Sequence, residues 1–122
     1  MLRLNCFLAA ALALSCGTAF AQSAPAGDAV RGKTIYVSDG CYQCHGYQGQ
    51  GSNAGSRLAP GVTPYAAFAN QVRNPRARMP AYSTVVLSDK DAADIYAFLR
   101  TIPKAKTVEE IPLLSRARGK TP

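Results

Sequence analysis

At residues 41–45 the chain carries the segment Cys-Tyr-Gln-Cys-His, on which the rest of its architecture depends. Two thiols three positions apart, followed at once by an imidazole, form the pattern by which c-type haem is attached to a protein. Each cysteine sulfur adds to one vinyl group of the porphyrin, and the adjacent histidine binds the iron from one face of the ring. The segment therefore predicts one covalent haem c on Cys41 and Cys44, with His45 as an iron ligand.

Two other uses of a Cys-x-x-Cys pair fit the sequence less well. A thioredoxin-like redox motif requires a strand–helix–strand context, and no such context follows this segment. A structural zinc site requires four ligands. The only further ligand type within reach is the thioether of Met79, which zinc rarely uses.

The first 21 residues have the features of an export signal rather than of a folded domain. Arg3 supplies a positive charge, residues 7–14 are a short apolar segment, and Ala19-Phe20-Ala21 fits the small-x-small cleavage pattern. The apolar segment is shorter than the roughly 20 residues that span a membrane. We therefore expect cleavage after Ala21, a periplasmic location and no membrane span in the processed chain. Lipidation at Cys16 fits less well, because the residues before it do not form a lipidation box.

Of the 122 residues, 101 remain once the first 21 are removed, which is the length of a single domain. We expect residues 22–103 to form that domain and residues 104–122 to form a basic, loosely structured tail. Processing also removes two of the four cysteines, and the remaining pair belongs to the 41–45 segment. A disulfide framework is therefore excluded.

The processed chain has a single histidine, His45, and a single methionine, Met79. A bis-histidine haem cannot form within it, so Met79 is the only thioether that can complete the iron. A lone methionine usually packs in a core. Met79, however, lies in a proline-containing segment without helical periodicity, residues 76–83, downstream of the haem-binding histidine. We expect an extended loop that presents Met79 as the second axial ligand.

A histidine that binds a metal usually donates its other ring N–H to a carbonyl or carboxylate. The candidate acceptor for His45 is the carbonyl of Pro60, which lies in a short apolar turn after a glycine-rich loop. The alternative is that Pro60 is a simple turn residue.

Three segments have apolar residues at helical spacing and suitable end signals. Asp28 is a candidate N-cap for the first helix, and Thr63-Pro64 fits the N-cap and first position of the second. Ser88 and Asp91 form a capping box before the third. The expected helices run from Asp28 to about Ser38, from Thr63 to Asn74, and from Ser88 to about Thr101.

Gly32 lies inside the first expected helix, where glycine costs about 1 kcal/mol relative to alanine. Close crossing by another helix would explain it, and we expect Tyr96 of the last helix to pack there. A tolerated surface glycine is the alternative.

The net charge is +7, and +6 once Arg3 is removed. A basic chain can bind nucleic acid, but this one has no nucleic-acid module and no aromatic–basic pattern. Electrostatic steering toward an acidic redox partner is the simpler explanation. Arg73, Arg76 and Arg78 lie close to Met79 in the sequence and predict a positive docking surface there. The alternative is a solvated arginine face without a partner.

These residues resemble the small bacterial class I cytochromes c, particularly the c domains found with haem–copper oxidases and periplasmic dehydrogenases. The resemblance covers about residues 28–103 and implies an all-α fold, with about three main helices and loops around one covalent haem. It also implies that His45 and Met79 are the axial ligands. The familiar Gly-Pro-Leu is replaced by Ala59-Pro60-Gly61, and tryptophan is absent. The matching segments are Gly32-x-x-x-Tyr36, residues 41–46, Gly49-x-Gly51, residues 72–75, residues 79–82 and residues 87–99.

Ligation by histidine and methionine saturates the iron and suits one-electron transfer rather than catalysis. We therefore expect a periplasmic electron carrier that is not itself an enzyme. It would carry electrons from a dehydrogenase to an acceptor such as a terminal oxidase. It would either diffuse between them or serve as the cytochrome subunit of the dehydrogenase. The alternative is a haem enzyme or gas sensor with an open iron position, if Met79 does not ligate.

Overall fold

The structure, a computed structural model, describes residues 24–119 of the chain. Within this range every regular element is an α-helix, as the sequence predicted. The export signal predicted for residues 1–21 lies outside the described residues. The helices are α1 (Ala29–Ser38), α2 (Cys41–His45), α3 (Tyr65–Arg73), α4 (Asp89–Thr101) and α5 (Pro112–Arg118).

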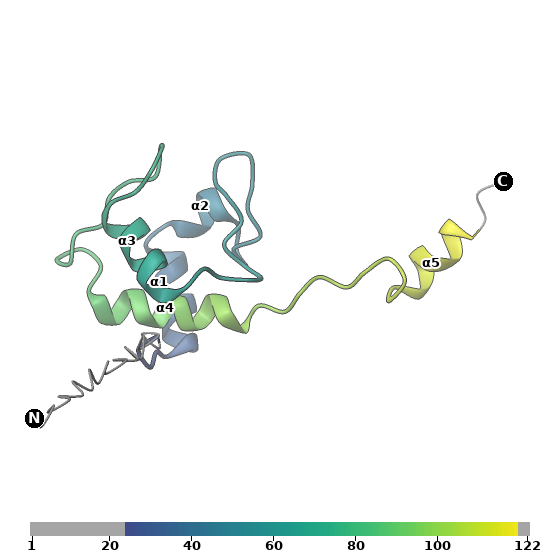
Figure 1. Ribbon diagram of the computed structural model, residues 1–122, viewed down its shortest axis with the longest axis horizontal. Helices are drawn as coiled ribbons and strands as arrows, with labels where there is room; N and C mark the ends of the chain where they lie inside the picture. The colour runs from purple at the N-terminus through teal and green to yellow at the C-terminus, as the bar shows by residue number, and fades with distance from the viewer. Residues whose placement is uncertain (1–23, 120–122) are drawn as a thin grey trace, which may run out of the picture.

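Helix α4 is the element against which α1 and α3 pack (Figure 1). It begins with the predicted capping box, because the Ser88 hydroxyl accepts from the Asp91 N–H and the Asp91 carboxylate accepts from the Ser88 N–H. Acidic residues in its first turn and Arg100 in its last turn oppose the partial charges of the helix ends. Most of α4 is buried, which makes it the central support of the domain.

The first and last predicted helices, α1 and α4, cross at Gly32. A Cβ atom at Gly32 would lie 1.9 Å from the carbonyl oxygen of Asp94, so a larger residue would force the helices apart. The predicted contact of Gly32 with Tyr96 is wrong. At about 100° per residue, positions 94 and 96 point to nearly opposite sides of the helix. The backbone at Asp94 faces α1, while Tyr96 packs on Phe68 of α3 with ring centroids 5.3 Å apart.

The carboxylate of Asp94 is fully buried beside this crossing. It accepts hydrogen bonds from the Lys90 ammonium and from the backbone N–H of Asp28, each at 2.8 Å, and it also pairs with the Arg31 guanidinium. These donors, Lys90 foremost, lower the pKa of Asp94 to about 2. A buried charge is tolerated only when it is paired and hydrogen-bonded. The ionised carboxylate therefore ties the start of α1 to α4.

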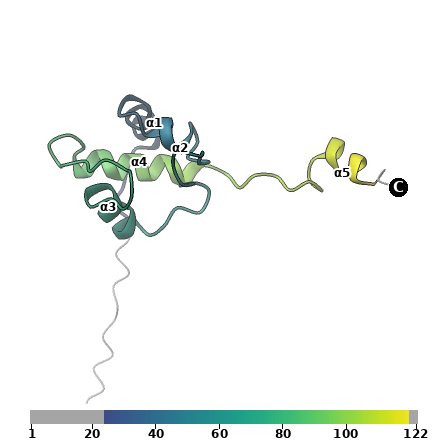
Figure 2. The same cartoon turned by 90° about the horizontal axis from the view of Figure 1, so that it is seen from above.

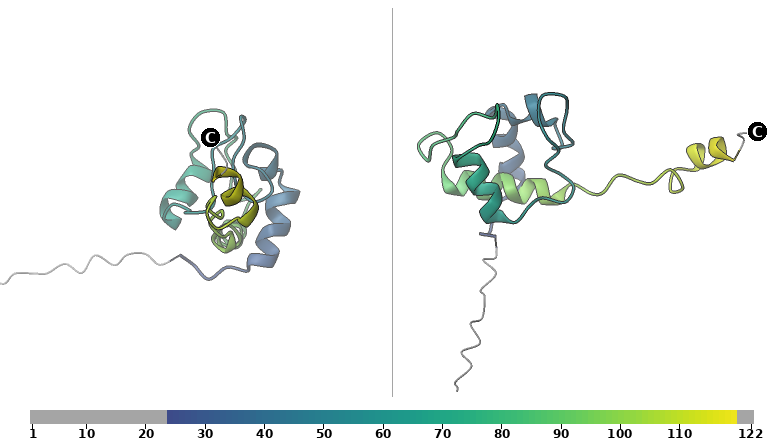
Figure 3. Two further views of the ribbon diagram at one scale, coloured as in Figure 1. Left: turned by 90° about the vertical axis from the view of Figure 1, so that its right-hand side faces the viewer. Right: turned by 45° about the horizontal axis from the view of Figure 1, so that its top comes forward.

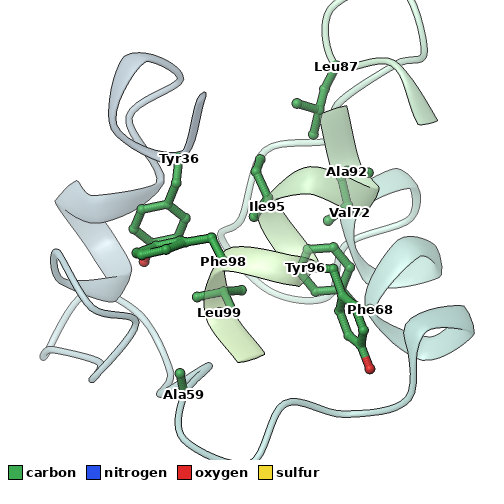
Figure 4. Packing of buried hydrophobic residues seen from close by; sticks show 10 residues of the cluster. All are labelled: Tyr36, Ala59, Phe68, Val72, Leu87, Ala92, Ile95, Tyr96, Phe98 and Leu99. Carbon is green, nitrogen blue, oxygen red and sulfur yellow. The ribbon is translucent and has the colours of Figure 1, made fainter. Parts of the chain in front are cut away.

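The apolar core lies between α1, α3 and α4 (Figure 4). Tyr36 of α1 packs on Phe98 of α4 with ring centroids 5.4 Å apart, and Leu99 is completely buried nearby. Phe68 and Val72 form the buried face of α3, as their helical spacing predicted. The core thus joins the three helices that the sequence identified.

Helix α3 starts one position later than predicted. Pro64 has an extended backbone and occupies the N-cap position, and Tyr65 is the first helical residue. The carbonyl of the preceding Thr63 accepts a hydrogen bond from the Tyr96 hydroxyl at 3.0 Å, so Thr63 belongs to the loop rather than to the helix. Asn74 ends α3, in agreement with the predicted stop before a proline.

Beyond α4 the chain leaves the domain as an extended segment that leads to α5 (Figures 1 and 2). Helix α5 packs on none of the other helices that the structure describes, and the right-hand view of Figure 3 shows it standing away from them. The structure thus adds a helix of two turns within the segment predicted to be loosely structured. Among residues 24–119, no helix has the length and apolar character needed to cross a membrane.

Candidate functional site

The segment at residues 41–45 forms the one-turn helix α2. Cys41, Cys44 and His45 occupy positions i, i+3 and i+4, which lie on one face of a helix. Gly40 and Gly46 flank the turn, each with a φ of 75°, a backbone conformation that residues other than glycine rarely adopt. The flanking glycines therefore let the chain enter and leave the turn sharply, while both thiols and the imidazole share one side of it.

The two thiols differ in their surroundings. Cys41 is half-buried and Cys44 is exposed, and neither is part of a disulfide. Burial raises the pKa of the Cys41 thiol to about 11. A redox-active Cys-x-x-Cys pair has a lowered pKa on its attacking thiol, so the raised value disfavours a thioredoxin-like role. In the described range 24–119, no three His, Cys, Asp or Glu side chains gather as they would around a metal such as zinc.

The orientation of His45 is set by the loop that follows α2. Nδ1 of His45 lies 2.6 Å from the backbone carbonyl oxygen of Ser56. Because a carbonyl only accepts, Nδ1 carries the proton and donates it, which leaves Nε2 with a free lone pair. Two further hydrogen bonds fold the loop back over the helix: the Gly51 N–H donates to the His45 carbonyl, and the Ser52 hydroxyl donates to the Cys44 carbonyl.

The prediction that Pro60 accepts from His45 is corrected by this geometry. Ser56 lies four residues earlier, on the part of the loop that returns across α2. The backbone N–H groups of Leu58 and Ala59 both donate to the Gly49 carbonyl. The part of the loop that crosses back over α2 therefore ends before Pro60. Pro60 is half-buried but does not line the cavity described below.

An almost wholly apolar cavity opens beside α2. Ligand sites are usually lined in this way, by apolar and aromatic side chains with a small number of polar groups. Cys41, His45 and Met79, three of the residues predicted to hold the cofactor, all line it. The other lining residues come from α1, α3, α4 and the connecting loops: Tyr36, Leu58, Phe68, Gln71, Val72, Tyr82, Leu87 and Ile95.

The loop that presents Met79 is held at Tyr82 by contacts from distant parts of the chain. The Tyr82 N–H donates to the Val72 carbonyl at 3.1 Å, and the Arg73 guanidinium donates to the Tyr82 carbonyl at 2.9 Å. The Tyr82 hydroxyl donates to the Asp39 carbonyl at 3.3 Å, which links this loop to the segment just before α2. The loop contains no helix or strand, turns at residues 77–78 just before Met79, and is anchored from both sides of the cavity.

Arg73 has a different role from the one that the sequence suggested. Its side chain is only 20% exposed, and it bonds both to the Tyr82 carbonyl and, at 2.7 Å, to the Asp89 carboxylate. It therefore holds the methionine loop to α3 and α4 instead of presenting its charge to a partner. Arg76 and Arg78 are exposed, as a docking surface requires.

Sequence reasoning did not identify Gln71, the amide side chain that lines the cavity beside Met79. Its Nε2 lies 4.0 Å from the Met79 sulfur. Gln71 follows Phe68 by three positions, so the helical spacing that identified the buried face of α3 also places Gln71 near that face. Gln71 was missed because only the apolar residues of this helix were assigned to its buried face.

A family model described as cytochrome C oxidase, cbb3-type, subunit III (Cytochrome_CBB3) matches residues 27–99. The matched range runs from just before α1 into α4 and contains every residue that lines the cavity. The chain belongs to this family. It is therefore a class I cytochrome c, as the resemblance implied, and the all-α fold agrees with this assignment. Searches of curated proteins and of solved structures gave no match.

The residues of the cavity fit the cofactor of the family. A c-type cytochrome carries haem attached through its Cys-x-x-Cys-His motif, which corresponds to Cys41, Cys44 and His45. Apolar walls suit a large aromatic ring, and an imidazole and a thioether on one cavity suit its iron. The cytochrome thus serves haem-based electron transfer, which in turn requires redox partners.

Proposed function

We propose that this cytochrome is a periplasmic one-electron carrier with a single haem c, whose iron is bound by His45 and Met79. The observation that carries the proposal is that these two side chains line the same apolar cavity as Cys41. After the expected processing they are also the only histidine and the only methionine in the chain. When bound, haem c supplies a one-electron couple, and a methionine ligand raises its reduction potential.

The chain's own residues have three tasks in this proposal. His45 is oriented by the Ser56 carbonyl, so that its Nε2 is available to a metal. Met79 is presented by a loop that Arg73 and Tyr82 hold in place. The apolar walls exclude water from the cavity and so favour transfer of an electron over binding of a polar substrate. With His45 and Met79 both bound to the iron, no position would remain there for a substrate.

The redox partners in this proposal present an acidic face. Arg76 and Arg78 are exposed on the methionine loop, and the net charge is +6 once Arg3 is removed by the expected processing. Opposite charges speed the encounter of two proteins, and salt screens the effect. A dehydrogenase as donor, or as the complex of which the cytochrome is a subunit, and a terminal oxidase as acceptor fit this chemistry.

Carbon monoxide binding to the reduced holoprotein tests the proposal. The wild type should not bind carbon monoxide, because Met79 closes the iron, whereas Met79→Ala should bind it readily. Val85→Ala is the matched control, since Val85 is 94% exposed and does not line the cavity. Ready binding by the wild type would mean an open iron, and the protein would then be a haem enzyme or gas sensor.

A further inference from the structure

Helix α5 has an apolar face that no described residue of the domain covers. Leu113 is 75% exposed and Leu114 is 44% exposed, although leucine is normally a core residue. At about 100° per residue, Leu113, Leu114 and Ala117 fall on one side of the helix. Arg116 and Arg118 fall on the two borders of that side. The helix is therefore amphipathic, with basic residues at both edges of its apolar face.

This arrangement is held by contacts within the segment itself. Pro112 occupies the first position of α5, where its fixed φ favours a helix start. The Arg118 guanidinium pairs with the Glu109 carboxylate, and the Glu110 carboxylate accepts from the Thr107 N–H at 2.7 Å. These contacts join the turn before the helix to the helix itself.

The segment is also basic. Residues 104–119 contain four basic side chains, namely Lys104, Lys106, Arg116 and Arg118, against the two glutamates. Both glutamates make the local contacts just described, which partly neutralises them. The complementary surface is therefore negatively charged and also accepts a few apolar side chains.

We propose that residues 104–119, with α5 as the inserting element, bind the surface of an anionic phospholipid membrane. An amphipathic helix lies in the plane of such a surface, with its apolar face below the headgroups and its basic residues among them. Each basic residue near an anionic surface strengthens binding by about fivefold. The leucines enter the acyl boundary, and the basic residues lie among the headgroups.

A protein groove fits α5 less well. Helices that bind in grooves use anchors at i, i+3 or i+4, and i+7, and α5 is only seven residues long. A stable protein interface uses roughly 20–30 residues a side, far more than this helix offers. A lipid surface requires no complementary shape. The small size and the basic borders of the face therefore favour lipid.

Membrane binding through α5 would leave the cytochrome domain free to turn. The eight residues 103–110 between the domain and the helix's entry point span at most about 28 Å when extended. The domain would be held within that distance of the surface, and its cavity and the Met79 loop would remain open to partners. The inference does not depend on the axial ligands of the haem.

Sedimentation of the full-length holoprotein with lipid vesicles tests the inference. Vesicles of phosphatidylcholine with about 30% phosphatidylglycerol should bind the protein at least tenfold more tightly than pure phosphatidylcholine, and about 0.5 M salt should abolish the difference. The double variant Leu113→Ser/Leu114→Ser should weaken binding at least tenfold. Lys106→Gln/Arg116→Gln should weaken it about 25-fold.

The matched control is Val85→Ser/Val86→Ser, which removes two exposed apolar side chains from the domain instead of from α5. This variant should bind vesicles as the wild type does. Absence of binding, or equal losses in the leucine and valine variants, would overturn the inference. A dimer in sedimentation velocity that the leucine substitutions abolish would also overturn it, because a second copy would then cover the face.

Discussion

The two sides of the cavity are built by different means. The His45 side is local: thiols, imidazole and the orienting Ser56 carbonyl all lie within residues 41–56, and the contacts among them are close in sequence. The Met79 side is held by residues that are distant from it in the sequence. Its loop is held by Arg73 and by the Asp39 carbonyl, which is 43 residues from Tyr82. The His45 side therefore depends on a short sequence motif, whereas the Met79 side depends on the packing of α1, α3 and α4.

The largest expected effect comes from the scaffold that both sides share. Gly32→Val should destabilise the cytochrome by about 3 kcal/mol or more, because any Cβ at this position meets the Asp94 carbonyl. Since α1 and α4 support the whole cavity, both sides should be disturbed together. Chemical denaturation of the holoprotein measures the loss. Val30→Ala on the same helix is the control, since Val30 is 80% exposed. Equal stabilities of the two variants would contradict the close crossing.

Acid should weaken the same scaffold through Asp94. Its pKa is about 2 in the folded state and about 3.9 in an unfolded chain, so the ionised form stabilises the fold. This contribution is complete above about pH 4 and is lost as the pH falls toward 2, at a cost of about 2 kcal/mol. Unfolding free energies measured from pH 5 to pH 2 should show this slope.

Asp94→Asn is the matched variant for the acid experiment. It should be less stable at pH 5 and should have a flatter profile below pH 4, because it has no carboxylate to protonate at that position. Asp91, whose pKa is also lowered, chiefly by its bond to Ser88, remains as a smaller source of acid sensitivity. An unchanged slope in Asp94→Asn would assign the acid loss to groups other than Asp94.

A smaller effect should separate the two sides. Arg73→Gln removes the charge-assisted bond to the Tyr82 carbonyl, which is worth about 1.5 kcal/mol. The Met79 ligation signal in the spectrum should then disappear at a lower denaturant concentration, while the covalent attachment of haem is unaffected. Arg76→Gln, an exposed neighbour, should leave ligation unchanged and only slow the reaction with an acidic partner at low salt. Identical behaviour of both variants would remove the distinction between the two arginines.

The smallest expected effect concerns Ser56. Its backbone carbonyl, not its hydroxyl, accepts from His45, so Ser56→Ala should change stability by less than about 0.5 kcal/mol and should leave the spectrum intact. Pro60→Ala should likewise leave the orientation of the histidine unchanged. A spectrum altered by Ser56→Ala would contradict the account, because it would mean that the serine hydroxyl, and not the backbone carbonyl alone, orients the histidine.

The comparison of the two sides also explains what the sequence could and could not predict. The His45 side could be predicted because five consecutive residues form its motif. The helices of the core were accessible because apolar spacing and caps such as Ser88–Asp91 are local signals. Met79 was predicted as a ligand by elimination, as the one thioether left after the expected processing, and it lines the cavity.

The features that the sequence did not predict depend on how the helices are rotated about their axes and packed against one another. The close contact with Gly32 comes from the backbone of Asp94, and the side of α4 that faces α1 is not specified by periodicity alone. The role of Arg73 required knowing that Tyr82 and Asp89 lie beside it. The carbonyl of Ser56 carries no side-chain signature. Helix α5 is short and packs on no other helix, so it lacks the long apolar stripe that identifies core helices.

The central claim is that His45 and Met79 together bind the haem iron, and the absorption spectrum of the oxidised holoprotein tests it most directly. The account predicts a low-spin spectrum with a weak sulfur-to-iron band in the far red. That band should be absent from Met79→Ala, in which the covalent haem is retained. A high-spin spectrum in the wild type, or a far-red band that survives in Met79→Ala, would contradict the account.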